Sequence, residues 1–102
     1  MAPMRLTTAE VQAIKRCAAA AFGRGAVVRL FGSRVDDRAH GGDIDLHIEV
    51  TREADTRVRA EARFRHLLET AVGERKIDIV LHRRGQREAP IDRIARQTGI
   101  ML

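Results

Sequence analysis

The chain has 102 residues, of which 44% are hydrophobic and 32% are charged. This length suits one small domain, so we expect a single folded module over residues 1–102 and no multidomain enzyme. Lysine and arginine total 19 against 14 acidic residues, and the formal net charge is +5. That charge favours polyanionic partners such as a triphosphate, a nucleic acid or an acidic protein.

Cysteine usage and hydropathy indicate the compartment. Cys17 is the single cysteine, which excludes an intrachain disulfide and suits a reducing environment. No apolar run approaches the roughly 20 residues that span a bilayer, and the first residues lack an apolar signal core. We therefore expect a cytoplasmic protein with no membrane partner. The chain has three phenylalanines and no tryptophan or tyrosine, which disfavours a base-stacking nucleic-acid module.

The first half of the chain predicts one helix and two strands. A capping-box pattern begins at Thr7, and apolar residues then recur at helical spacing over 8–22. Residues 26–31 form a short β-branched run bounded by glycines, which favours a strand. After a polar loop, residues 43–50 alternate strictly between apolar and polar side chains, as a half-buried strand does. The polar positions of this second strand are Asp43, Asp45, His47 and Glu49.

The second half predicts a helix, a strand and a last helix. Thr51 is a candidate cap for a helix reaching residue 72, with a buried stripe of Ala60, Phe64, Leu67, Leu68 and Ala71. Residues 76–82 alternate as a third strand. Pro90 suits a first helical position, and Ile91, Ile94 and Ala95 are expected to face inward. The tail 100–102 suits an edge strand. This order predicts a two-layer α/β (α+β) module with a small mixed sheet packed on helices.

Three aspartates interrupt the apolar strands at positions that face away from the buried side. Asp43 and Asp45 lie about 6.6 Å apart on one face, and Asp78 is about 4.8 Å to the side if its strand is adjacent. Converging carboxylates repel one another unless divalent cations lie among them. A pair of magnesium ions in such a site can hold both oxygens of a phosphoryl displacement. The alternative is that these aspartates are solvated residues on the open face of a half-exposed sheet.

Gly32 and Ser33 follow the first strand directly and form a candidate phosphate site. Backbone N–H groups and a hydroxyl face an anion at such a turn, and glycine lets phosphate approach the chain closely. The alternative is that Ser33 caps a helical turn together with Asp36, which needs no ligand.

Three segments together carry a resemblance to a known family: Gly32-Ser33-Arg34, Gly42-Asp43-Ile44-Asp45-Leu46 and Lys76-Ile77-Asp78-Ile79-Val80. They resemble the nucleotidyltransferase superfamily related to DNA polymerase β. More narrowly, they resemble the minimal nucleotidyltransferases, which often act as antitoxins beside a HEPN ribonuclease toxin. The resemblance covers nearly the whole chain. Two features depart from the pattern: residues 34–42 make a slightly short connection, and Gly42 stands where a serine often precedes the first aspartate.

The resemblance implies a polymerase β-like fold and a defined reaction. Gly32 and Ser33 would contact the triphosphate of ATP, and Arg34 would either contact phosphate or pair with a surface carboxylate. Two Mg²⁺ ions would bind at the family's three carboxylates, which match Asp43, Asp45 and Asp78. An acceptor oxygen would attack the α-phosphate and release pyrophosphate. In an antitoxin of this family, AMP would pass to the HEPN toxin.

Other readings of the same residues stay open. His40 and His47 beside Asp43 and Asp45 suggest a metallohydrolase, although catalytic zinc usually takes a richer histidine set. We expect His47 and His82 to be partly exposed beyond the metals. The competing functions are a non-catalytic antitoxin that masks its partner with a vestigial metal site, and a nucleic-acid-binding regulator. The chain has no room for an acceptor-holding domain, so a toxin or a second copy in a homodimer would complete the cleft.

Overall fold

The computed structural model describes residues 6–32, 44–54, 58–74 and 76–102, and within them the chain forms three helices and four strands. This confirms a small α+β domain with a mixed sheet. The elements are α1 (Thr8–Phe22), β1 (Val27–Phe31), β2 (Ile44–Val50), α2 (Val58–Val72), β3 (Ile77–Arg83), α3 (Pro90–Thr98) and β4 (Ile100–Met101).

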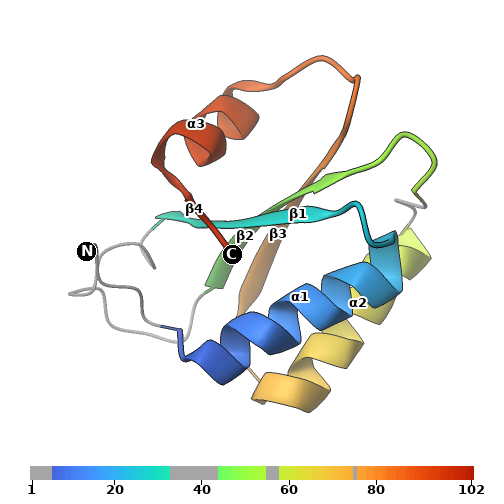
Figure 1. Ribbon diagram of the computed structural model, residues 1–102, viewed down its shortest axis with the longest axis vertical. Coiled ribbons are helices and arrows are strands. Elements are labelled where there is room, and N and C mark those ends of the chain that lie inside the picture. The colour runs from blue at the N-terminus through green and yellow to red at the C-terminus, as the bar shows by residue number, and fades with distance from the viewer. Residues whose placement is uncertain (1–5, 33–43, 55–57, 75) are drawn as a thin grey trace.

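The four strands form one sheet in the order β3-β2-β1-β4. Strand β1 pairs antiparallel with both β2 and β4, whereas β2 and β3 are parallel. A parallel pair needs a crossover connection, and α2 provides it. Helices α1 and α2 lie side by side on one face of the sheet, and α3 lies on the opposite face (Figure 1). The tail forms the expected edge strand β4.

The main core lies between the sheet and the pair α1–α2. The capping box at Thr7 is present, because its side chain accepts from the Glu10 N–H while the Glu10 carboxylate accepts from the Thr7 N–H. The rings of Phe22 and Phe64 join the two helices at a centroid distance of 5.6 Å. Cys17 is buried among these side chains. The sheet contributes Val28, Leu30, Ile44, Leu46, Ile48, Val50 and Ile77 to this core.

Helix α2 is shorter than the sequence predicts. Thr51 does not cap it, since the Thr51 carbonyl accepts from the Ala54 N–H in a turn and the helix begins at Val58. Ala71 is exposed. Its expected burial is wrong because the buried positions recur every four residues, at Ala60, Phe64 and Leu68, and so continue to Val72. None of the helices in the described ranges is long and apolar enough to cross a membrane.

Helix α3 presents a different face to the sheet from the one predicted. Ile91 and Ile94 are 38% and 50% exposed, whereas Asp92 and Ala95 are buried. The Asp92 carboxylate accepts from His47 Nε2 at 2.7 Å and from the Ala89 N–H at 2.7 Å, and it lies 3.3 Å from His82 Nδ1. These contacts with strands β2 and β3 fix the rotation of α3, because turning its isoleucines inward would carry Asp92 away from the sheet and leave the buried His47 without this partner.

The same contacts determine the ionisation of Asp92. Burial by itself raises the pKa of this carboxyl, but the hydrogen bonds from His47 and Ala89 and the nearby His82 outweigh burial and lower the pKa below its usual value. A lowered pKa in the folded state stabilises the protein above the pKa of the unfolded carboxyl, about 3.9. This stabilisation is lost as the pH falls through the folded pKa.

We predict that Asp92→Asn lowers the free energy of unfolding at pH 7 by about 1.5–3 kcal/mol, the usual worth of a hydrogen bond to a charged group. The deficit relative to the unmodified chain should shrink in acid, as the pH falls below the ordinary aspartate pKa and through the lowered pKa of folded Asp92, where this carboxyl becomes protonated. Urea unfolding at pH 7 and at an acid pH measures this deficit in the free energy of unfolding. Glu69→Gln, at an exposed carboxylate of α2, is the control that should change little. An equal deficit at both pH values would contradict the assignment.

Candidate functional site

Two of the predicted carboxylates stand opposite each other in the sheet. The parallel register pairs Asp45 of β2 with Asp78 of β3, and neighbouring strands lie about 4.8 Å apart. Both residues alternate with core positions, so they share the face that points away from α1 and α2. Asp45 is partly buried and Asp78 is exposed. The adjacency on which the sequence argument depended is therefore present.

Gly32 brings the end of β1 against the Asp45 carboxylate. Its φ is +75°, a left-handed conformation that side chains rarely adopt. A Cβ atom built on Gly32 would lie 2.5 Å from Asp45 Oδ2 and 3.1 Å from Asp45 Cγ. The Asp45 carboxylate thus occupies the space that a side chain at Gly32 would take. The absence of a side chain at this position lets the backbone turn and Asp45 meet.

The other predicted residues of the site cannot be placed. Asp43, Ser33, Arg34 and the histidine at position 40 lie outside the described residues. The structure therefore brings together Gly32, Asp45 and Asp78 from three neighbouring strands. Over the described part of the chain, no group of three His, Cys, Asp or Glu side chains is arranged to hold a metal ion.

The residues present fit a hard divalent cation. Asp45 and Asp78 offer only oxygen atoms, which Mg²⁺ prefers, and the close approach at Gly32 keeps one carboxylate at the mouth of the β1 turn. Magnesium usually takes one or two protein carboxylates and fills its remaining positions with water and phosphate oxygens. Two aspartates at this edge are therefore a sufficient protein contribution for one such ion, with Asp43 as the expected third ligand.

A buried polar cluster lies next to the carboxylates and was missed from the sequence. His47 is 1% exposed, although it was expected to be partly exposed, whereas His82 is partly exposed as expected. Their rings stack at a centroid distance of 6.2 Å, and both contact Asp92. We call His47, His82 and Asp92 the histidine cluster. The sequence feature that could have indicated this cluster is Asp92. It is a polar residue in the first turn of a helix that follows two strands with outward-facing histidines.

The histidine cluster bears on the metallohydrolase alternative. His47 Nε2 lies 2.7 Å from Asp92 Oδ1, so this nitrogen is already occupied by a hydrogen bond. Its other nitrogen, Nδ1, is buried and has no hydrogen-bond partner within the described residues. A catalytic zinc ion usually takes three protein ligands, and among the described residues no three His, Cys, Asp or Glu side chains are arranged to hold a metal. His47 instead connects β2 to α3.

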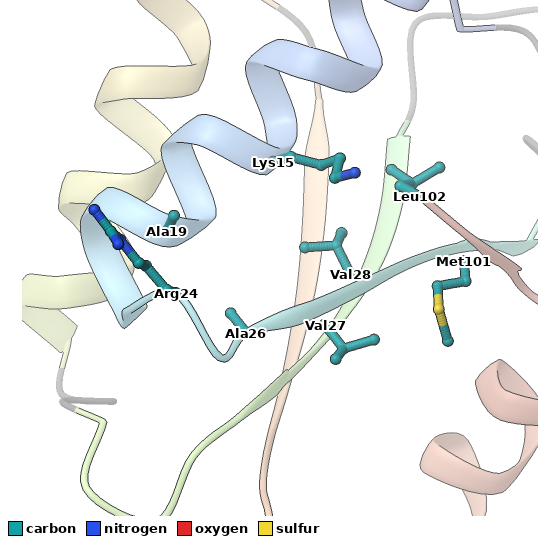
Figure 2. A pocket seen from close by; sticks show the side chains of 8 residues that line it. All are labelled: Lys15, Ala19, Arg24, Ala26, Val27, Val28, Met101 and Leu102. Carbon is teal, nitrogen blue, oxygen red and sulfur yellow. The ribbon is translucent and has the colours of Figure 1, made fainter.

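A cavity of about 290 Å³ lies at the opposite edge of the sheet, between α1 and the pair β1–β4. Figure 2 shows Lys15 reaching from α1 towards Leu102, while the guanidinium of Arg24 points away from Met101. Its described lining includes no acidic side chain, and its walls are mostly apolar. It is therefore separate from the aspartates, which lie towards β3. Its lining residues are Lys15, Ala19, Arg24, Ala26, Val27, Val28, Met101 and Leu102.

Comparison with known proteins adds no relative. No protein-family model matches the chain, and no curated protein matches it significantly. The functional argument therefore depends on the motifs and on the geometry of the sheet.

We predict that Gly32→Ala displaces the Asp45 carboxylate, because the new Cβ would overlap Oδ2. Gly73→Ala is the matched control: its φ is +88°, but a Cβ there would meet nothing within 4 Å. Both variants should lose about 1–2 kcal/mol of stability from the left-handed backbone. Only Gly32→Ala should shift the side-chain carboxyl ¹³C resonance of Asp45 in an NMR spectrum. An Asp45 resonance unchanged by Gly32→Ala would show that the two residues do not touch.

Proposed function

We propose that this protein is a Mg²⁺-dependent nucleotidyltransferase that transfers AMP from ATP to a partner protein. The acceptor that we propose is a HEPN ribonuclease toxin, which this chain would neutralise as its antitoxin. The observation that supports the proposal most directly is the pairing of Asp45 with Asp78 beside Gly32, at the end of β1.

Electrostatics explains why this pairing points to a cation. Two carboxylates on adjacent strands, about 5 Å apart, repel each other when both are ionised. A solvated sheet face tolerates one such residue at little cost, but opposed like charges across a strand pair are destabilising. A bound divalent cation removes the repulsion. When bound, two magnesium ions would neutralise the triphosphate and hold both the attacking and the leaving oxygens.

The chain's own residues would bind and orient the reactants. Asp45, with Asp43, would ligate both ions, and Asp78 would ligate one of them and orient the acceptor hydroxyl. The turn at Gly32 and Ser33 would place backbone N–H groups against the phosphates, assisted by Arg34. The acceptor oxygen would form a bond to the α-phosphorus while the bond to the bridging oxygen breaks. Pyrophosphate would leave, and the proton of the acceptor would pass to a carboxylate or to water.

Two features of the surface suit a macromolecular acceptor. Asp78 is exposed, so a group on another protein can reach it. The net charge of +5 raises the local concentration of ATP and of acidic surfaces.

We predict that label from α-³²P-ATP passes to the acceptor with Mg²⁺ and that γ-labelled ATP gives no labelled band. Asp45→Asn and Asp78→Asn should each reduce the rate at least about 100-fold, which corresponds to about 2.7 kcal/mol. The control is Glu49→Gln, on the same face of β2 but bonded to Arg84 at 3.1 Å, and it should keep most of the rate. The acceptor is a co-expressed toxin or a lysate of the source cells.

The outcomes separate catalysis from masking. If Asp45→Asn still binds the toxin but no longer protects cells, transfer of AMP is the protective step. If Asp45→Asn protects fully, the carboxylates are dispensable and the protein acts by covering its partner.

A further inference from the structure

Within the described residues, no strand lies beside the outer side of β3. β3 stands at the end of the strand order, and its seven residues pair with β2 on one side only. The strand at the other end, β4, has two residues. Edge strands of this length present a row of N–H and C=O groups that can pair with another strand, and proteins usually shorten or cover them. β3 is therefore the stronger candidate for pairing between chains.

The direction of the outward backbone groups follows from the bonds that β3 already makes. The Lys76 carbonyl accepts from the Ile44 N–H, and the Arg84 N–H donates to the Val50 carbonyl, so even-numbered residues turn their backbone groups towards β2. Backbone groups alternate along a strand, so those of Ile77, Ile79, Leu81 and Arg83 point away from β2. The guanidinium of Arg65 bonds to the Ile77 carbonyl on that outer side, in agreement with this assignment.

The side chains along the edge are apolar in the middle and charged near the ends. Ile79 and Leu81 pack partly against the core, and Val80 is partly exposed on the opposite face. Asp78 and His82 flank Val80 on that opposite face. In an antiparallel pair of two β3 strands, the residues that meet have numbers with a constant sum. A sum of 160 pairs all seven residues: Ile77 then lies opposite Arg83 of the second copy, Asp78 opposite His82, Ile79 opposite Leu81, and Val80 opposite its own equivalent.

We propose that two copies of this chain associate through β3 in this antiparallel register, with Val80 on the two-fold axis. The outward backbone groups of Ile79 would bond to those of Leu81 of the second copy, and their side chains would extend the apolar layer. Asp78 would stand opposite His82 of the second copy, so the one acidic residue of the strand meets a basic residue. This complementarity within a single strand favours a second copy over an unrelated chain.

The dimer would complete the candidate site with a residue from each chain. Even-numbered residues form the non-hydrogen-bonded pairs, whose side chains lie closest, about 4.5–5.5 Å between Cβ atoms. His82 directs Nδ1 at Asp92, so its Nε2 is the atom that can reach Asp78 across the axis. This second part rests on the proposed function, because it makes the second copy's His82 a neighbour of the proposed catalytic carboxylate. The association itself does not depend on that function.

The interface is small, so the dimer should be weak. A pair of seven-residue strands buries less than the roughly 1,600 Å² of a standard interface. We expect reversible association that increases with concentration, with a dissociation constant in the micromolar range.

Sedimentation equilibrium of the full chain over a wide concentration range tests the association. Val80→Glu and Val80→Lys each place two like charges face to face on the axis, so each variant alone should be monomeric. An equimolar mixture of the two should regain the dimer, because glutamate then opposes lysine. Val58→Glu, at a position of α2 that is 86% exposed, is the control that should dimerise as the unmodified chain does.

A cysteine on the axis tests the register. Cα atoms of a non-hydrogen-bonded pair are about 4.5 Å apart, within the range for a disulfide. Val80→Cys should therefore form a disulfide-linked dimer on mild oxidation, while Val58→Cys should not, and the native Cys17 is buried. The proposal is overturned if the chain stays monomeric at millimolar concentration, or if the dimer persists unchanged in Val80→Glu. Failure of the Val80→Cys crosslink in a chain that does dimerise overturns the register.

Discussion

The parallel pairing of β2 with β3 is the constraint on which the rest of the structure depends. Because parallel strands cannot be joined by a tight turn, this pairing requires the crossover through α2, and α2 together with α1 covers the apolar face of the sheet. The same register sets Asp45 opposite Asp78, and alternation carries both carboxylates to the face away from that core. A slip of one residue would reverse the faces and bury the carboxylates, so the hydrophobic pattern that fixes the fold also fixes the site.

The second face of the sheet is organised by polar contacts, since α3 buries Asp92 and leaves Ile91 and Ile94 exposed. The histidine cluster gives that carboxylate partners from β2 and β3, and it stiffens both strands next to the aspartates. The proposed cation site would gain a rigid base from these contacts, because such a site tolerates little movement of its ligands. If two copies pair through β3, the same cluster would support the residue that crosses to the neighbouring site.

Much of this arrangement could be predicted from the sequence because local patterns were strong. The capping box at Thr7, the strict alternation before Val50 and the glycine after β1 correspond to observed features. What could not be predicted was which side chains of α3 meet the sheet. The apolar periodicity of α3 favoured Ile91 and Ile94 as buried residues, and the long-range contacts of Asp92 with His47 and His82 reverse that choice. The start of α2 was placed too early because the backbone at Thr51 forms a turn, in which its carbonyl accepts from the Ala54 N–H.

The central claim is that Asp45 and Asp78 form one divalent-cation site at the end of β1. Paramagnetic broadening by Mn²⁺ in the presence of ATP tests it most directly, because the effect falls steeply with distance from the ion and needs no acceptor. The account predicts that the amide signals of Gly32, Asp45 and Asp78 broaden first and together, and that Asp45→Asn abolishes the effect. Broadening centred on the cavity beside Lys15, or on no defined site, would contradict it.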